Sequence, residues 1–325
     1  MLQQTNFSNR LHKEILKLCH CAKLKPHNFV RGCKLFNNYQ RVALIVLYIQ
    51  SGKSLRDFIG NLDGSLTAWK HWLQLRKIPA KSTLHSWLKT FNLDFIRKLL
   101  QQTITGIKPE IVAVDGSGVD TQYKSSYFQK RLKDFGTRKP KDPWHKLDII
   151  VDVKSKEKWI LDFSFLLKQK HDMKVARQLF KRFKLKNLIV LADKGYYWFN
   201  LSNLLLSKNC TLVVPPKNYG IKRVHKNLQR KKFHEQYEVN KEYYPLRNNV
   251  ESVFSSLKRV QGLKIRSRKS FMKKREMAWQ IVWYNIRKKL SCASFFYLIF
   301  IKIVEKYMKI HKKMNIKFSF QLINK

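Results

Sequence analysis

The sequence predicts an α/β protein, in which an all-helical N-terminal part precedes a mixed sheet flanked by helices. Up to about residue 105, apolar residues recur at helical spacing between breaks at Ser51-Gly52, Asp63-Gly64 and Pro79. From Glu110 onward, short apolar runs typical of buried strands alternate with amphipathic helical stretches. Strands and helices in this order predict one sheet with helices packed on it.

The charge of the chain indicates a polyanionic partner. The 325 residues, 44% of them hydrophobic, are enough for two domains with a real core. There are 67 Lys and Arg against 21 Asp and Glu, a formal net charge of +46. Nucleic acid is the polyanion that best explains this charge, and an acidic membrane surface is the rival. Basic residues interleaved with Trp, Tyr and Phe favour nucleic acid.

The cysteines and the N-terminus predict a soluble cytoplasmic protein. The five cysteines form no CxxC pair, and the chain starts without a secretory pattern. The apolar run Cys292–Ile301 is too short to span a bilayer, so no membrane partner is expected. Buried or incidental thiols are favoured over a zinc site, because the spacing of the possible ligands matches no familiar finger. Those ligands would be Cys19, His20, Cys21, His27 and Cys33.

The N-terminal part predicts a DNA-binding unit over residues 1–105. Helices are expected at 41–50, 54–61, 66–75 and 82–91. The last two resemble a helix-turn-helix, with a break at Lys77–Ala80 and Ser82 or Thr83 as the cap of the second helix. An ordinary helical bundle with basic surfaces is the alternative. The residues expected to meet DNA phosphates are Arg76, Lys77, Lys81, His85 and Lys89.

Two buried strands of the second part each end in an aspartate. Ile111–Val114 leads to Asp115 and then to the turn-forming Gly116-Ser117-Gly118. Leu188–Ala192 leads to Asp193. Between and after them we expect a hairpin of Lys146–Lys154 with Lys158–Phe165, helices at Asp172–Phe183, Phe199–Ser207 and Phe271–Leu290, and a strand at Thr211–Val214.

A basic connector leads to four polar residues that share one helical ridge: Tyr244, Arg247, Glu251 and Lys258. At about 100° per residue, their directions on a single helix fall within roughly 60° of one another. Pro245 suits the first turn of that helix. The apolar residues expected on the adjacent, packed face are Val250, Val253, Phe254, Leu257 and Val260. A surface helix with ion pairs four residues apart is the alternative interpretation.

Three acidic residues, Asp115, Asp193 and Glu251, together predict a metal site. Carboxyl ends of neighbouring strands meet at one sheet edge, so Asp115 and Asp193 should lie close together. Glu251, on a helix covering that edge, would complete three carboxylates. Such ligands select Mg²⁺ or Mn²⁺, and two ions about 4 Å apart can activate a water or a 3′-hydroxyl against a phosphodiester. Either aspartate could instead be a turn or helix cap. The competing acids, which rank lower, are Asp120, Asp148, Asp152 and Asp172, the last of them as a helix start.

The stretch Tyr244-x2-Arg247-x3-Glu251-x6-Lys258 resembles the signature of the DDE transposases in the insertion-sequence superfamily numbered four and five. The segments VAVDGSGV around Asp115 and LADKGYYW around Asp193 look like the first and second catalytic regions of that family. The basic segment Ile265–Arg268, followed by a Trp-rich helix, is similar to its C-terminal helix. The resemblance covers about residues 111–290.

The resemblance implies an RNase H-like catalytic domain at 106–290, with Asp115, Asp193 and Glu251 as ligands of two Mg²⁺ or Mn²⁺ ions. Tyr244, Arg247 and Lys258 would position transposon-end DNA. The implied activity is hydrolysis at the ends of the element followed by attack of the 3′-hydroxyl on target DNA. The implied partners are double-stranded DNA, with the N-terminal part reading the terminal inverted repeats, and a second copy of the chain in a synaptic complex.

Two features depart from the family. Fifty-seven residues separate Asp193 from Glu251, so the large β-rich insertion of some relatives is absent. The tail at 291–325 matches nothing in the family. Two other functions remain open: an RNase H-fold nuclease that cuts without joining, and a DNA-binding protein without catalysis, such as an inactive or domesticated copy.

Overall fold

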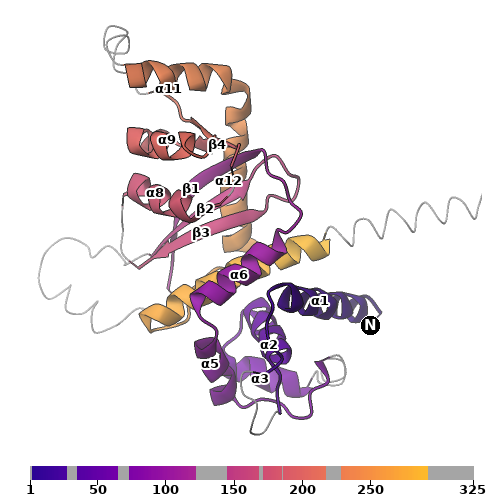
Figure 1. Ribbon diagram of the computed structural model, residues 1–325. Coiled ribbons are helices and arrows are strands. Elements are labelled where there is room, and N and C mark those ends of the chain that lie inside the picture. The colour runs from indigo at the N-terminus through magenta and orange to yellow at the C-terminus, as the bar shows by residue number, and fades with distance from the viewer. Residues whose placement is uncertain are drawn as a thin grey trace, which may run out of the picture.

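The structure, a computed structural model, describes residues 2–27, 35–64, 73–121, 145–167, 171–184, 186–216 and 228–291. It is a mixed α/β fold, with a five-stranded sheet flanked by helices (Figure 1). No helix in these ranges is long and apolar enough to cross a membrane. The tail beyond Ser291 lies outside the described residues.

The described residues of the N-terminal part form helices. Its helices are α1 (Leu2–Cys21), α2 (Asn38–Ser51), α3 (Leu55–Gly64), α5 (Lys81–Thr90) and α6 (Leu93–Thr103). Local signals explain the ends of α2: Asn37 and Gln40 form a reciprocal capping box, and Gly52 ends the helix at a φ of 63°. Most of the helix expected at 66–75 falls outside the described residues, so the helix-turn-helix stays a prediction.

The sheet has the strand order β3-β2-β1-β4-β5. Strand β1 pairs antiparallel with β2 and parallel with β4, while β2–β3 is the predicted antiparallel hairpin and β4–β5 is parallel. Because β1 is the central strand, its side chains lie next to those of β2 on one side and β4 on the other. The strands are β1 (Ile111–Val119), β2 (His145–Asp152), β3 (Ile160–Leu166), β4 (Ile189–Ala192) and β5 (Thr211–Val213).

The prediction of a turn at Gly116-Ser117-Gly118 is wrong, because β1 continues through all three residues to Val119. Its pairing with β2 is unbroken from Val112 opposite Asp152 to Val119 opposite His145. A complete ladder of backbone hydrogen bonds outweighs the weak strand preference of glycine. Asp115 therefore lies in mid-strand, with its side chain on a sheet face.

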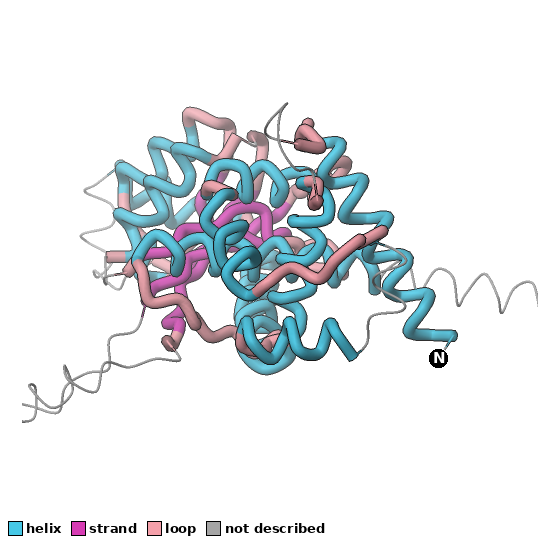
Figure 2. The backbone as a smooth tube through the Cα atoms, turned by 90° about the horizontal axis from the view of Figure 1, so that it is seen from below, coloured by secondary structure: helices cyan, strands magenta, loops and turns pink. Residues whose placement is uncertain are grey.

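Each face of the sheet packs on a different apolar cluster. Val112, Val114 and Ile150 pack on the side of α8 (Asp172–Arg182) and α9 (Phe199–Leu206). The alternate residues, including Ala113 and Ile149, join a larger cluster that contains α12 (Asn248–Ser255), N-terminal helices and the final helix at 270–291. Seen from below, helices surround the sheet (Figure 2). The apolar core thus runs on from the sheet into the N-terminal part.

The final helix links the sheet to the N-terminal part, crossing beside α6 (Figure 1). Asn285, fully buried on this helix, accepts a hydrogen bond from the Ile160 backbone N–H (3.1 Å) and donates to the Ile160 carbonyl (2.9 Å). The same amide also donates to the Thr103 hydroxyl of α6, at 2.9 Å. One amide therefore fixes this helix to an edge strand and to an N-terminal helix.

Candidate active site

Asp115 and Asp193 come from neighbouring parallel strands. Val114 of β1 lies opposite Ala192 of β4, and each aspartate follows directly. Side chains alternate along a strand, so both aspartates fall on the face that packs against α12. The register therefore brings the two aspartates onto adjacent strands, although Asp115 lies within β1 and not past its carboxyl end as expected.

The guanidinium of Arg247 connects Asp115 of β1 to Glu251 of α12. Arg247 places Nη1 3.6 Å from Asp115 Oδ2 and donates from Nη2 to Glu251 Oε1 at 2.9 Å. The Arg247 side chain is 17% exposed and that of Asp115 24%, whereas that of Glu251 is 60% exposed. Arg247 and Asp115 are thus partly withdrawn from water, where an ion pair is stronger. Glu251 reaches the same guanidinium from the solvent side.

The electrostatics of Asp115 show that the three acids influence one another. Burial raises the pKa of Asp115, while the hydrogen bond from the Gly116 N–H (2.8 Å) and the positive charge of Arg247 oppose the rise. The charges of Asp193 and Glu251 raise the pKa of Asp115 further. A like-charge effect of this kind requires the acids to be near neighbours. A cation among them would be favourable.

The ridge from Tyr244 to Lys258 is not the single α-helix that was predicted. Lys241–Arg247 is a 3₁₀ helix that contains Pro245, Asn248–Ser255 is α12, and Ser256–Val260 is a π turn. The three hydrogen-bond patterns still leave the functional side chains on one side. Lys258, on the π turn, donates to the Ser117 hydroxyl of β1 at 2.8 Å. Arg247 and Lys258 therefore both face β1.

The packed face of this stretch is as predicted except at its end. Val250, Val253, Phe254 and Leu257 are buried, whereas Val260 is 71% exposed. The wider π turn changes the rotation per residue and carries Val260 out of the packed face. Tyr244, at the other end, is half-buried with its ring 5.6 Å from that of Tyr237. Burial raises the pKa of the Tyr244 hydroxyl, against the effect of Arg247.

The competing aspartates of β2 lie on the other side of the sheet. Asp148 and Asp152 alternate with Ile149 and Val151, so they face the α8 side rather than α12. Asp152 Oδ1 accepts the backbone N–H groups of Lys154 (3.2 Å) and Ser155 (3.3 Å), a turn-forming role. Their position on the α8 side agrees with ranking Asp148 and Asp152 below Asp115 and Asp193 as candidate metal ligands.

The α8 side also holds a polar group that the sequence interpretation missed. Asp172 is in the first turn of α8, as predicted, and its carboxylate accepts a hydrogen bond from Lys146. The Lys146 ammonium is also 3.4 Å from Asp148 Oδ1. The alternation of charged residues in β2, at 146 and 148, was the available signal. Asp120 directly follows β1, and its backbone carbonyl accepts the Ile265 N–H at 3.1 Å.

Charge and donor type of the three acids suit a hard divalent cation. As the side chains stand, no group of three or more acidic, His or Cys side chains in the described ranges converges on one metal position.

In the cysteine-rich N-terminal segment, Cys19 is buried and Cys21 exposed, and burial raises the pKa of the Cys19 thiol to about 12. Cys33 lies outside the described residues.

The basic residues predicted to meet DNA in the N-terminal part are at the surface. Arg76, Lys81 and Lys89 are all exposed, Lys81 at the start of α5 and Lys89 near its end. Arg76 precedes the break before α5. Their exposure is compatible with phosphate contacts and leaves that role as a prediction.

Comparison with known proteins identifies the second part of the chain. The profile of the family described as "Transposase DDE domain" matches residues 106–286. The chain belongs to this family. The matched DDE domain contains Asp115, Asp193, Glu251 and the whole ridge from Tyr244 to Lys258.

Among solved structures, the DDE transposase chain is similar to the cryo-EM structure of the piggyBac transposase synaptic complex with hairpin DNA. The identity is 14% and the TM-score 0.41, over 88% of this chain and 74% of that one. No curated protein sequence matches.

Proposed function

We propose that the protein is a DNA transposase of the insertion-sequence superfamily numbered four and five. It hydrolyses phosphodiesters at the ends of its element and joins the 3′-hydroxyl to target DNA. The observation that carries the proposal is the single guanidinium of Arg247, which contacts Asp115 and Glu251 while Asp193 follows the neighbouring strand β4. The strand order β3-β2-β1-β4-β5, antiparallel on one side of β1 and parallel on the other, supports an RNase H-like core.

The catalytic roles fall to Asp115, Asp193 and Glu251. Burial raises the pKa of Asp115, and the charges of Asp193 and Glu251 raise it further, so a divalent cation among these acids would be favourable. Mg²⁺ or Mn²⁺ suits oxygen ligands. Two such ions supply activation of the attacking oxygen and stabilisation of the leaving oxygen. The described acids on the α8 side of the sheet take no part.

The cations around these acids hold the DNA strand. Arg247 balances the charge of Asp115 and Glu251, and its planar fork also suits a phosphate. Lys258 donates a hydrogen bond to the Ser117 hydroxyl, on the same face of β1 as Asp115. The half-buried ring of Tyr244 offers a stacking or hydroxyl contact at the start of the ridge. Together they align the backbone with the carboxylates.

The partners follow from this role. The substrate is double-stranded DNA, both the terminal inverted repeats and the target, and the net charge of +46 supports it. Two copies of the chain assemble on paired ends, with the N-terminal helices reading the repeats. The protein would act on DNA in the cytoplasm, at the nucleoid.

The experiment uses a supercoiled plasmid carrying the gene with its flanking genomic sequence. Wild type with Mn²⁺ or Mg²⁺ should nick at the element ends, because Arg247 joins Asp115 to Glu251 and Asp193 follows the strand next to Asp115. Glu251→Gln and Asp115→Asn should lower the cleavage rate by about 10³-fold or more while retaining DNA binding. Glu238→Gln, which changes an exposed glutamate on α11 (Leu228–Val239), is the matched control.

The outcomes separate the alternatives. Cleavage by Glu251→Gln at the wild-type rate would refute the site. Tight binding without cleavage by wild type would favour the non-catalytic DNA-binding protein. Cleavage without joined products would favour the nuclease.

A further inference from the structure

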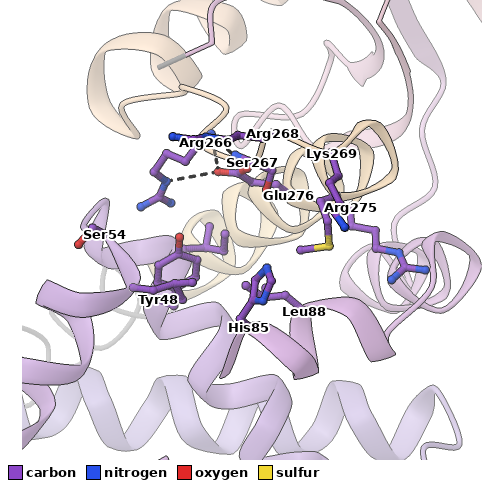
Figure 3. A pocket seen from close by; sticks show the side chains of 13 residues that line it. Tyr48, Ser54, His85, Leu88, Arg266, Ser267, Arg268, Lys269, Arg275 and Glu276 are labelled. Carbon is purple, nitrogen blue, oxygen red and sulfur yellow. Dashed lines mark hydrogen bonds and ion pairs between the residues drawn. The ribbon is translucent and has the colours of Figure 1, made fainter. Parts of the chain in front are cut away.

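A cavity of about 380 Å³ opens between the N-terminal helices and the segment that starts the final helix (Figure 3). Apolar side chains line it on both sides, among them Ile49, Leu88 and Met272. Cationic or ionisable side chains also line it: His85, Arg266, Arg268, Lys269 and Arg275. The cavity lies outside the group formed by Asp115, Asp193 and Glu251.

Among the described residues that line the cavity, the one carboxylate is already neutralised. Glu276 is 6% exposed and accepts hydrogen bonds from the Arg266 N–H (3.1 Å), the Arg266 Nε (3.3 Å) and the Ser267 N–H (2.8 Å). Its charge therefore holds the Arg266–Ser267 backbone in place. Within the described part of the chain, Glu276 forms no ion pair with Lys269.

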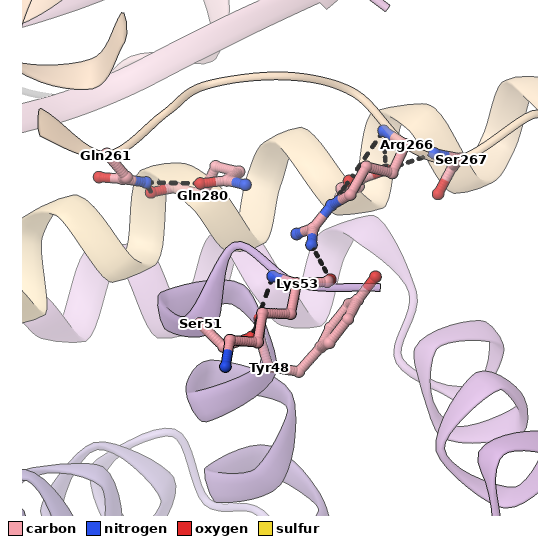
Figure 4. A network of polar contacts seen from close by, with 8 residues as sticks. Tyr48, Ser51, Lys53, Gln261, Arg266, Ser267 and Gln280 are labelled. Carbon is pink, nitrogen blue, oxygen red and sulfur yellow. Dashed lines mark hydrogen bonds and ion pairs between the residues drawn. The ribbon is translucent and has the colours of Figure 1, made fainter. Parts of the chain in front are cut away.

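Two arginines fix the walls of the cavity to each other. Arg266 donates to the Lys53 carbonyl, and its guanidinium lies 4.8 Å from the centre of the Tyr48 ring, so it ties the final segment to the end of α2 (Figure 4). Arg275 donates to the Lys89 carbonyl at the end of α5. The cleft is thus held open by the fold, and binding there needs little ordering of the protein.

Positive charge accumulates where the walls meet. The pKa of His85 is lowered, first by burial and then by the charges of Lys89 and Lys269, one from each wall. Neither lysine belongs to an ion pair among the described residues. The walls hold like charges close together, which is unfavourable unless an anion lies between them.

We propose that this composite cleft, formed by α5 and residues 266–275, holds the phosphate backbone of duplex DNA. Lys269 of one wall and Lys89 of α5, whose carbonyl accepts a hydrogen bond from Arg275, contact phosphates from the two sides. The cleft adds a second DNA-binding surface to the active site, and this role rests on the proposed function of the chain as a DNA transposase.

The layout of charge favours a nucleic-acid backbone. Lys81, His85 and Lys89 follow at intervals of four along α5, a basic ridge about 12 Å long. The charges of Lys81 and Lys89 on this ridge, together with Lys269 of the other wall, suit a regularly charged polymer. A protein contact between copies would bring two such cationic surfaces together, so it is the less favourable occupant.

The first test measures binding of the full-length chain to a 30-bp duplex of arbitrary sequence, by fluorescence anisotropy in EDTA at several salt concentrations. Lys89→Gln with Lys269→Gln removes two phosphate contacts. The slope of log K against log salt should become shallower by about 1.8, and affinity should fall about eightfold per contact at 0.1 M salt. Lys184→Gln with Lys186→Gln, exposed lysines between α8 and β4, is a control of equal net charge.

The second test locates the contact without any substitution. Wild type is acetylated with an amine-reactive ester, with and without the duplex, and the lysines are quantified by mass spectrometry. DNA should protect Lys89 and Lys269 several-fold and leave Lys184 and Lys186 reactive.

Equal protection of all four lysines, or equal slopes for the two double variants, would overturn the proposal. Loss of self-association on mutation, with DNA binding unchanged, would instead make the cleft a contact between copies. Because both tests omit metal and cleavage, they stay informative if the proposed catalysis fails.

Discussion

At the scale of single residues, alternation along a strand decides which acids belong together. Asp115 faces α12 and meets Arg247, whereas Asp148, on the adjacent strand, faces α8 and meets Lys146. The two acids are close in the sheet and different in role. Asp148 is 1% exposed, and burial raises its pKa to about 7, against the charge of Lys146.

A buried acid with a raised pKa makes the fold pH-sensitive. Between the ordinary pKa and about 7, the folded state binds one proton more than the unfolded state, so the free energy of unfolding falls as pH rises. Asp148→Asn lacks this ionisation. Relative to wild type, it should gain roughly 3–4 kcal/mol between pH 4.5 and pH 8, measured by urea denaturation.

The matched control for Asp148→Asn is Glu235→Gln, at an exposed glutamate on α11. It should leave the pH dependence of wild type unchanged. If Asp148→Asn and wild type follow parallel curves from pH 4.5 to pH 8, the carboxyl ionises normally.

At the scale of elements, β1 joins the two polar sites by presenting one to each face. Gly116 is the residue between them: a Cβ there would lie 2.7 Å from Asp148 Oδ1 and 3.0 Å from Lys146 Cε. The glycine is required by this close approach of side chains from β2, and not by a turn. It allows the Lys146–Asp148 pair to pack directly beneath the strand that carries Asp115.

Gly116→Ala should therefore destabilise the sheet. The added methyl group must push Asp148 and Lys146 aside, at a cost of about 1–3 kcal/mol. Because Asp115 is the next residue, DNA cleavage should fall more than the unfolded fraction explains. Urea denaturation and the nicking rate measure the two effects.

Gly60→Ala is the control, since nothing lies within 4 Å of a Cβ at that helical position. It should leave stability unchanged or raise it by up to about 1 kcal/mol. A stable Gly116→Ala protein with full activity would show that the sheet accommodates the methyl group.

At the scale of the whole molecule, one apolar cluster contains N-terminal helices, one face of the sheet and the final helix. The division into residues 1–105 and 106–290 stays a prediction, and the core continues across that boundary. The cleft between α5 and residues 266–275 exists because the final segment returns to the N-terminal helices. The two parts should therefore unfold together.

Asn285→Ala tests this coupling. It leaves buried groups of Ile160 and Thr103 without their partner, and should lower the free energy of unfolding by roughly 3 kcal/mol. Circular dichroism and tryptophan fluorescence should report one coincident urea transition in wild type and variant. Two separate transitions would show independent units. Asn203→Ala, at an exposed position on α9, should change stability by less than about 0.5 kcal/mol.

The sequence by itself determined most elements and the candidate acids. Apolar runs at periods of 2 and 3.6 locate β4, β5, α8 and α9 within a residue or two, because burial of one face is a local pattern. Aspartates after apolar runs indicated Asp115 and Asp193, which the register places on adjacent strands, although β1 continues past Asp115. The Arg247–Glu251 pair follows from helical spacing alone.

Only the tertiary structure decided what depends on partners distant in sequence. Strand β1 continues through Gly116-Ser117-Gly118 because β2 supplies its hydrogen bonds, and no local signal encodes that supply. The Lys258–Ser117 contact spans 141 positions, and the cationic cleft needs Lys89 and Lys269 from opposite ends of the chain. Periodicity states which face of a segment is buried, whereas packing alone states against what it is buried.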